Sequence, residues 1–394
     1  MSNFTNYNNA SYSNNNNDNM KNPRNKKPTN PITKRLWRIF MKSFLITTVI
    51  FFAIVGSVRF AWSRAVAPPA IQAMGHIPVP QSESDGEQSE EVEYYYEEEP
   101  EVEYIWPAPE RFTDDDRREL FWTFLIIGLN EGRNANTVMV ASYCGVNNEA
   151  NLISIPRDVP INPNRSGHAQ KLSSSYLAGA GGGRGRDGGI ARVQMDVMNV
   201  IGFIPDYYVL IDYETFFTII DAVGGIDVYV PIRMRYSDPH QNLEIDLQPG
   251  MQHMDSATAL EFVRFRQSNR NSPYPSLPDG DIGRTRNQQA VINAVISSLL
   301  TPASILRIPD FVSIFNDSVH TNMNFREMMF FALELNNIRG TDALSTDTFV
   351  PARSSGRPYY FEFLSPTGVL EIVNNYLNPF KHNIELRDLN IATG

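Results

Sequence analysis

Residues 206–230, DYYVLIDYETFFTIIDAVGGIDVYV, hold the pattern that decides the fold. The segment DYYVLI (206–211) is an apolar run of the length of a buried strand, and YETFFTIIDAV (213–223) carries apolar residues at helical spacing. Two glycines end that helix, and IDVYV (226–230) returns as a strand. A strand, a helix and a second strand in succession indicate a layered α/β domain.

The alternation of strands and helices continues on both sides of this segment. Strands are predicted at 120–129, 137–144 and 151–156 and near 347–351. Helices are predicted at 189–202, 256–263, 282–300 and 325–335, the third of them strongly amphipathic. We therefore expect one α/β domain over residues 111–380, built on a central mixed β-sheet sandwiched by helices, with a C-terminal tail at 381–394.

The N-terminal part predicts a membrane anchor. Residues 1–42 begin with an Asn-rich segment that is expected to be disordered, and eight Lys and Arg lie between Lys21 and Lys42. The uncharged run SFLITTVIFFAIVGSV follows, and we expect a single N-terminal transmembrane helix at 43–62. The basic flank predicts a cytoplasmic N-terminus and an extracellular C-terminal domain at the cell membrane. A cleavable signal peptide is the rival interpretation, which the long segment before the run disfavours.

Residues 63–110 are predicted to form an acidic extracellular linker. Between Ser82 and Glu110 there are twelve Asp and Glu and no Lys or Arg, so this segment accounts for the net charge of −10. Like charges extend such a chain, which favours a solvated spacer. The tyrosines of EEVEYYYEEEPEVEY leave open a docking motif for a basic partner. The single cysteine, Cys144, lies in an apolar run typical of a buried core residue.

Arginines beside apolar anchors are the main polar feature of the predicted domain. In VRFRQ, Val263 and Phe265 alternate with Arg264 and Arg266. Residues two apart share a face on an extended segment but not on a helix. If the helix that begins at Ser256 ends before Arg264, both guanidinium groups point to one side. An anion between them would then relieve their repulsion.

The segment PDGDIGRTRNQQ (278–289) adds to this set. Asp281 is a candidate N-cap, which places Arg284 in the first helical turn. Free backbone N–H groups also attract anions there. Gln288 lies one turn further along the same face.

Two other segments contribute cations. Arg157 follows a predicted strand in SIPRD, and Lys171 follows in KLSSSY. In open α/β sheets, ligands bind beyond the carboxyl ends of the strands, which is where Arg157 is expected. The glycine-rich segment 177–189 carries Arg184 and Arg186, and is either a flexible linker or a mobile lid that brings both to a phosphate. Surface ion pairing is the alternative for each cation taken singly. The chain has no GxSxG, HExxH, Walker or CxxC motif, and its histidines show no ligand spacing.

Together these segments resemble the LytR-CpsA-Psr family of cell-surface phosphotransferases, which move glycopolymers from a polyprenyl-pyrophosphate carrier onto peptidoglycan. The matching segments cover about residues 121–300 and are LIIGLN, NTVMVAS, ISIPRDV, KLSSSY, GFIPDYYVLIDYETFFTIIDAVGGIDVYVP, IDLQPGMQHMDSATALEFVRFR and DIGRTRNQQ. The positions that the resemblance assigns to the pyrophosphate are Arg157, Arg264, Arg266 and Arg284, with Lys171 and Gln288 contributing. It also implies that the lipid lies in an apolar cavity between sheet and helices, with candidate residues in 213–223 and 291–300.

The chain departs from the family at the implied metal site. Family members carry two aspartates that bind Mg²⁺ on the loop after the first strand, whereas this loop reads GLNEGRNANT, with Asn130 and Asn136 at those positions. An amide oxygen brings no charge and Mg²⁺ favours carboxylates, so we expect its binding to be badly weakened. Glu131 is the neighbouring carboxylate that would have to substitute.

Three functions are compatible with the sequence. The first is a transferase in which arginines replace the charge of the metal. The second is a non-catalytic protein that binds polyprenyl-pyrophosphate-linked glycopolymer or scaffolds wall assembly, and the third is a pyrophosphatase acting on carrier lipids. The retained arginines favour the first. The expected partners are the carrier-linked glycopolymer, peptidoglycan and the membrane, and no nucleic acid.

Overall fold

The computed structural model describes residues 41–42, 68–70, 112–131, 133–161, 167–241, 243–300, 307–338, 344–356 and 358–392. The chain divides into two units, Met1–Arg64 and Ala65–Gly394, and the folded domain belongs to the second. The predicted membrane helix at 43–62 lies outside the described residues. Within the described ranges, none of the helices has the length and apolarity that a membrane crossing requires.

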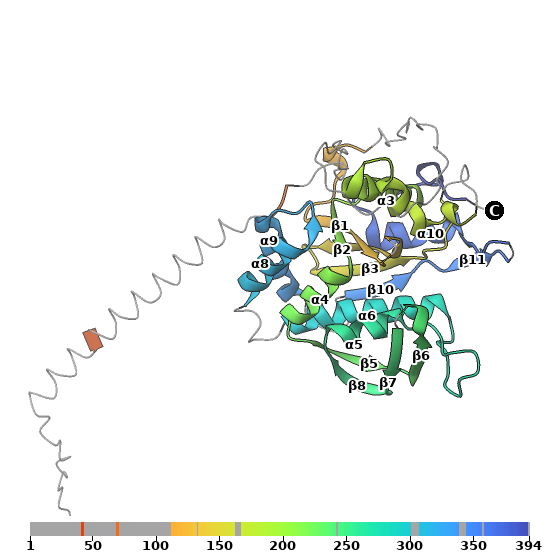
Figure 1. Ribbon diagram of the computed structural model, residues 1–394. Helices are drawn as coiled ribbons and strands as arrows, with labels where there is room; N and C mark the ends of the chain where they lie inside the picture. Colours follow the sequence, from red (N-terminus) through yellow and green to blue (C-terminus); the bar gives the residue numbers. More distant parts are fainter. Residues whose placement is uncertain are drawn as a thin grey trace, which may run out of the picture. The chain divides into compact units, whose positions relative to one another are not determined.

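The domain is built on a six-stranded mixed sheet with the strand order β10-β3-β2-β1-β4-β9 (Figure 1). Its strands are β1 (Phe121–Leu129), β2 (Ala135–Cys144), β3 (Glu149–Ile155), β4 (Tyr207–Ile211), β9 (His320–Thr321) and β10 (Leu344–Thr348). The pairs β1–β2, β2–β3 and β4–β9 are antiparallel, whereas β1–β4 and β10–β3 are parallel. The predicted α/β fold with a central mixed sheet is therefore confirmed.

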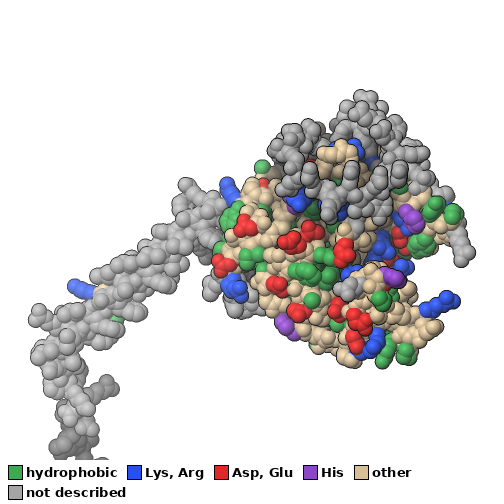
Figure 2. Space-filling view, viewed as in Figure 1, with side chains coloured by type: hydrophobic (Ala, Val, Ile, Leu, Met, Phe, Trp, Pro, Cys, Tyr) green, Lys and Arg blue, Asp and Glu red, His purple; other side chains and the backbone are tan. Residues whose placement is uncertain are grey.

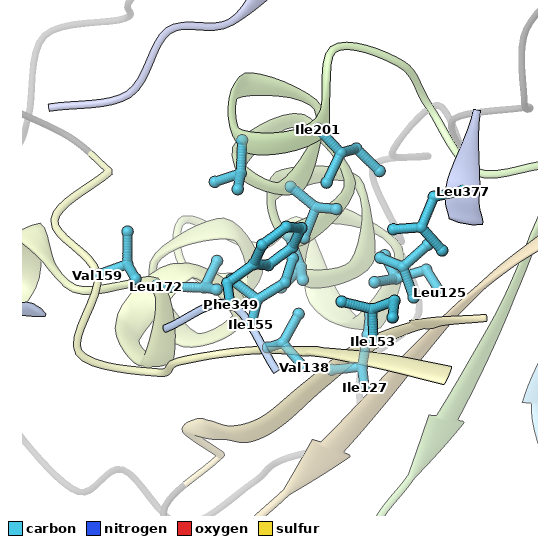
Figure 3. Close-up of a cluster of buried hydrophobic side chains, with 14 of the residues drawn as sticks. Leu125, Ile127, Val138, Ile153, Ile155, Val159, Leu172, Ile201, Phe349 and Leu377 are labelled. Atoms are coloured by element: carbon cyan, nitrogen blue, oxygen red, sulfur yellow. The ribbon is translucent and has the colours of Figure 1, made fainter. Parts of the chain in front are cut away.

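Helices cover one face of this sheet and enclose the largest apolar core. They are α2 (Ser175–Ala180), α3 (Gly185–Ile201) and α10 (Pro366–Ile372). Leu125 and Ile127 of β1 are fully buried against this layer, because alternate residues of a strand face the same side. Phe349 and Leu377 complete the cluster from the C-terminal part of the chain (Figure 3). Burial of this apolar surface is the main force that holds the layers together.

The opposite face carries helices that lie between the main sheet and a second layer of strands (Figure 1). The helices are α4 (Tyr213–Ala222), α5 (Ser256–Arg264) and α6 (Asp281–Leu299). Helices α8 (Ile308–Ser318) and α9 (Phe325–Glu334) pack against each other beside this layer. In α6, only Arg286 and Ser297 are exposed. The expectation of a strongly amphipathic helix at 282–300 is therefore wrong, because the second layer covers the side that would otherwise face solvent.

The strand predicted at 226–230 forms, but it lies in the second layer. There β5 (Ile226–Val230) pairs with β8 (Gly250–Met254), and β6 (Met234–Asp238) pairs with β7 (Leu243–Leu247). Gly224 and Gly225 have φ angles of 81° and 90°, a left-handed conformation that favours glycine. These two residues turn the chain away from the main sheet after α4.

The glycine-rich segment 177–189 is neither a linker nor a lid, because it ends α2 and begins α3. The backbones of the two helices touch. A Cβ atom on Gly179 would lie 2.3 Å from the carbonyl oxygen of Gly188, and one on Gly188 would lie 2.5 Å from that of Gly179. The glycines therefore allow α2 and α3 to pack closely. This is a tertiary contact, which the local sequence does not reveal.

The C-terminal part adds a hairpin and several short helices. The hairpin consists of β11 (Pro351–Ser354) and β12 (Glu362–Leu364), so the strand expected near 347–351 is divided between β10 and β11. The short helices are η1 (Asp114–Asp116), η2 (Gly167–Gln170), η3 (Leu172–Ser174), η4 (Pro239–Gln241), η5 (Leu335–Asn337), η6 (Val373–Leu377) and η7 (Leu386–Asp388). Beyond residue 380 the chain still packs on the domain, since Ile384 is buried in the main core.

Candidate functional site

A cavity of about 380 Å³ lies between the main sheet, helices α4, α5 and α6, and the second layer. Its polar and charged lining includes Asn130, Asn136, Arg157, Asp212, Tyr213, Gln241, Arg264, Arg266, Gln267, Arg284 and Gln288. Its apolar lining includes Ile126, Leu129, Ile211, Phe216, Leu243, Leu260, Val263, Val291 and Ile292. The combination suits a ligand that carries both an anionic group and an apolar part.

The structure brings the four predicted arginines and Gln288 together in this cavity. Arg157 follows β3, and Arg284 lies in the first turn of α6. Arg264 is the last residue of α5, so the helix ends at this arginine rather than before it. The chain is extended at Phe265, which is fully buried, and this anchor directs Arg266 back to the cavity.

Asp281 is the acidic centre of the arginine cluster. Its Oδ1 lies 2.9 Å from Nη2 of Arg284, 3.4 Å from Nη2 of Arg157 and 3.9 Å from Nε of Arg266. The expected N-cap role is wrong: Gly280, with a φ of 55°, occupies the N-cap position and Asp281 is the first helical residue. Its side chain contacts the arginines instead. The spacing of three residues from Arg284 was the signal for this contact.

The cluster is short of negative charge. Burial lowers the pKa of Arg284 to about 10, Asp281 opposes this shift, and the positive charges of Arg157 and Arg266 add to it. The Nε atoms of Arg157 and Arg284 are buried and make no hydrogen bond to any described residue. Buried donors without acceptors are costly, so a bound anion would satisfy both the charge and the hydrogen bonds.

Arg264 lies slightly apart from these three arginines. It donates a hydrogen bond of 3.1 Å from Nη2 to Oε1 of Gln241, and its guanidinium carbon lies 5.6 Å from the ring centre of Tyr213. Burial raises the pKa of Tyr213, and the positive charge of Arg264 partly offsets this. Tyr213 belongs to segment 213–223, whose residues were candidates for the cavity lining, and it does line the cavity. Gln241 also lines it but was not predicted, because it approaches Arg264 only in the tertiary structure.

The two asparagines at the implied metal positions also line the cavity, but their oxygens are already engaged. Oδ1 of Asn130 accepts a hydrogen bond of 2.8 Å from the backbone N–H of Asn134. Oδ1 of Asn136 accepts one of 3.1 Å from Nη1 of Arg157. Within the described ranges, no group of three His, Cys, Asp or Glu is arranged to hold a metal ion. These neutral, hydrogen-bonded donors do not fit Mg²⁺, which prefers carboxylates.

Lys171 lies behind the cluster rather than in the cavity lining. It is buried, and its Nζ donates to Oδ1 of Asp158 at 2.7 Å. The other oxygen of Asp158 lies 3.9 Å from Nε of Arg157. Lys171 therefore neutralises the carboxylate next to Arg157 and contributes to the site indirectly.

Arg184 and Arg186 are not in the cavity lining. Nε of Arg184 donates to the carbonyl oxygen of Gly181 at 3.1 Å. Arg186 interacts with Tyr176, whose pKa is raised by burial and lowered in part by this arginine. Acidic and basic side chains are interspersed on the face shown in Figure 2, so the cavity arginines are distinguished by their convergence rather than by a broadly basic surface there.

The fold and cavity define an α/β domain in which converging arginines lie next to an apolar surface. The chain belongs to the LytR_cpsA_psr family, whose model matches residues 111–365. The polyisoprenyl-teichoic acid–peptidoglycan teichoic acid transferase TagV of Bacillus subtilis is 26% identical over 222 residues, which are 54% of this chain and 52% of TagV. The corresponding transferase TagU of Bacillus anthracis is 28% identical over 201 residues, with 51% of this chain and 58% of TagU covered.

The chain thus spans about half the length of these curated relatives. Among solved structures, that of B. subtilis TagV superposes with a TM-score of 0.52 at 22% identity, and the match covers 66% of this chain and 96% of TagV. This likeness concerns the fold.

Proposed function

We propose that the chain is a cell-envelope phosphotransferase that moves a glycopolymer from a polyprenyl-pyrophosphate carrier to peptidoglycan. The observation that carries the proposal is the convergence of Arg157, Arg266 and Arg284 on one carboxylate inside a cavity that also has an apolar lining. A lipid-linked pyrophosphate has the matching parts, an anion and a hydrocarbon chain. The transferase activity for which the TagV and TagU relatives are named supports the same class of reaction.

The reaction is the attack of a sugar hydroxyl of peptidoglycan on the phosphorus that carries the glycopolymer. A new oxygen–phosphorus bond forms as the bond from that phosphorus to the bridging oxygen breaks. Polyprenyl phosphate leaves with the bonding electrons, and the hydroxyl proton passes to solvent or to a base. The guanidinium groups of the cavity arginines would bind the pyrophosphate oxygens and offset the charge that develops on them during transfer.

We propose that this transfer does not depend on Mg²⁺. The donors at Asn130 and Asn136 are neutral and hydrogen-bonded, and Asn136 holds the guanidinium group of Arg157. The positive charge at this end of the cavity then comes from arginine. Because arginine stays protonated near neutral pH, this charge is permanent.

We further propose that residues 43–62 anchor the chain in the cell membrane, with residues 1–42 cytoplasmic and the domain extracellular beyond the linker at 63–110. The apolar run and its basic flank support this topology. Protease added to intact cells should remove the domain and spare the N-terminal segment. A domain that stays protected until the cells are lysed would contradict this topology.

The transferase proposal is tested with the full-length chain, a polyprenyl-pyrophosphate-linked oligosaccharide and peptidoglycan fragments, in the presence of Mg²⁺ or EDTA. We expect mass spectrometry to detect oligosaccharide joined to peptidoglycan, in equal amounts under both conditions. The product should be lost in Arg284→Ala. It should be retained in Arg286→Ala, because Arg286 points outward from the same helix and pairs with Asp279.

The same experiment separates the other candidate functions. A non-catalytic carrier-binding protein is favoured by the two asparagines alone, and it would bind the donor tightly without forming product. A pyrophosphatase would release phosphorylated oligosaccharide with water as acceptor. Either result in the wild-type chain would rule out the proposed transfer to peptidoglycan.

A further inference from the structure

The hairpin β11–β12 carries a row of aromatic rings outside the cavity. We call Tyr359, Phe361 and Phe363 the aromatic row. The ring centres of Tyr359 and Phe361 are 6.5 Å apart, and those of Phe361 and Phe363 are 6.3 Å apart. Phe363 lies in β12 and the other two residues lie just before it, and the two ring contacts place the three side chains next to one another along this segment.

The aromatic row is accessible at its Tyr359 end, where the neighbouring Tyr360 is 44% exposed as well. Glu362 and Leu364, which alternate with the row, are buried, whereas Phe361 and Phe363 are half-buried and Tyr359 is 40% exposed. A contiguous accessible apolar patch on a protein surface commonly marks an interaction site when it is large. Successive rings are tilted by 50° and 61°, so they follow a twisted line rather than one flat plane.

A cationic or titratable group lies at each end of the aromatic row. At one end the ring of His168 meets that of Tyr359 edge to face, with the centres 5.1 Å apart. At the other end the guanidinium carbon of Arg353 lies 4.7 Å from the ring centre of Phe363. Arg353 itself is exposed, so its remaining N–H donors are available to a ligand.

The aromatic row is next to the arginine cluster. The backbone N–H of Glu362 donates to the carbonyl oxygen of Asp158 at 3.0 Å, directly after Arg157 in the chain. Nζ of the buried Lys171 lies 6.0 Å from the ring centre of Phe361 and also binds Asp158. The hairpin and the phosphate-binding end of the cavity are therefore held together through Asp158.

We propose that the aromatic row binds the acceptor glycan, a chain of linked sugar rings that carries carboxylates, and presents it to the arginine cluster. The inference rests on the proposed function. The C–H face of a sugar ring packs on the negative face of an aromatic ring, and each tilted ring meets a different sugar of a twisted chain. Arg353 suits the carboxylates of such a glycan, whereas a lipid acyl chain would gain nothing from a cation at the end of an apolar strip.

The binding test uses the full-length chain and soluble glycan strands prepared from peptidoglycan, with no donor lipid present. The wild-type chain should bind the strands, and Tyr359→Ala should weaken the affinity about tenfold, since one stacking contact is lost. Tyr359→Phe retains the ring and should bind within about twofold of wild type. Tyr229→Ala, which changes an exposed tyrosine on β5, is the matched control and should leave the affinity unchanged.

Arg353→Ala tests the charged end of the row. It should reduce affinity for the carboxylate-bearing strands more than affinity for an uncharged oligomer of N-acetylglucosamine. Equal affinity of wild type and Tyr359→Ala for the strands would overturn the inference. Retention on anionic phospholipid vesicles that is weakened by Tyr359→Ala, together with no binding of glycan strands, would also overturn it, in favour of a membrane contact of the row.

Failure of the proposed transferase function would give different experimental results from failure of the glycan-binding inference. Binding of inorganic pyrophosphate, followed by thermal shift, reports on the arginine cluster and should be unaffected by Tyr359→Ala. If pyrophosphate binds as expected but the glycan result is negative, only the aromatic row is excluded. If transfer is absent while glycan binding depends on Tyr359, the row is a glycan site but its role as acceptor site is excluded.

Discussion

Asp281 and Arg284 lie three residues apart on α6 and form a close ion pair, with Oδ1 2.9 Å from Nη2 and both side chains 11% exposed. Arg157 and Arg266 approach the same carboxylate from other parts of the chain. In the ligand-free protein, Asp281 therefore does what a bound pyrophosphate would do, since it offsets the repulsion between the arginines.

Asp281→Asn should consequently change stability and anion affinity in opposite directions. We expect the free energy of unfolding to fall by roughly 2–3 kcal/mol, because the buried arginines lose their acidic partner. Inorganic pyrophosphate should bind about tenfold more tightly, because a competing charge is gone. Urea unfolding and calorimetric titration measure the two effects. Asp279→Asn, whose partner Arg286 is exposed, is the control and should show neither.

Arg284→Met should stabilise the ligand-free protein at neutral pH. Burial lowers the pKa of Arg284 to about 10, so the charged form is disfavoured in the folded state at every pH below that value. This cost lifts only as pH rises from about 10 towards the ordinary value of 12.5. Removal of the charge should therefore raise the free energy of unfolding by roughly 1–3 kcal/mol, while pyrophosphate binding is lost. A loss of stability would mean that the pair with Asp281 outweighs the cost of burial.

The contact of α2 with α3 predicts a contrast between two glycines of one segment. A Cβ on Gly188 would lie 2.5 Å from the carbonyl oxygen of Gly179, so Gly188→Ala should destabilise the protein by about 1–3 kcal/mol. Gly181→Ala is the control, because the nearest atom would be 3.6 Å away and no unusual φ is required. Thermal unfolding should separate the two variants, and similar melting temperatures would show that the helices can shift apart.

These glycines illustrate which parts of the fold can be predicted from the sequence. Apolar periodicity was sufficient for β1 to β4 of the main sheet and for α3 to α6, because each of those patterns is local. It missed the two-residue strand β9 and placed β10 a few residues too late. It was not sufficient for the partner of β5 or for the packing of segment 177–189. Both depend on contacts between residues that are distant along the chain, and a glycine in a tight helix contact has the same local sequence as one in a loop.

The candidate site shows the same division. The sequence predicted Arg264 and Arg266 as site residues from their alternation with apolar anchors, and Arg284 from its place in a helical turn. All three side chains line one cavity. The acidic partner shared by three arginines was not predicted, since it depends on β3, α6 and the loop after α5 converging. Lys171 was placed with the ligand-binding residues, whereas in the structure it binds Asp158.

The buried Glu362 should make stability depend on pH. Burial raises its pKa, the negative charges of Asp158 and Asp281 add to this, and the hydrogen bond from Tyr360 and the charge of Arg157 oppose it. The folded state then keeps the proton longer than the unfolded chain does. The stabilising contribution is complete below the ordinary pKa of 4.5 and is lost as pH rises from there through the raised pKa.

Glu362→Gln should remove this dependence. The decline in melting temperature from about pH 4.5 upward should become shallower, and the amide oxygen of the substituted side chain can still accept the hydrogen bond from Tyr360. Glu371→Gln, an exposed position on α10, serves as the control and should leave the profile unchanged. An unaltered slope in Glu362→Gln would show that other groups determine the pH dependence in this range.

Metal dependence is expected to appear only when carboxylates are restored. In the wild-type chain, Asn136 accepts a hydrogen bond from Arg157, and EDTA should not change the affinity for inorganic pyrophosphate. Asn130→Asp combined with Asn136→Asp adds two hard, charged ligands, so Mg²⁺ should then tighten pyrophosphate binding by about tenfold. The single variant Asn136→Asp is the control, because it strengthens the bond to Arg157 but supplies one acid only. Calorimetric titration with and without Mg²⁺ distinguishes these cases. A wild-type chain that loses pyrophosphate affinity in EDTA would contradict the proposal that arginine alone supplies the positive charge.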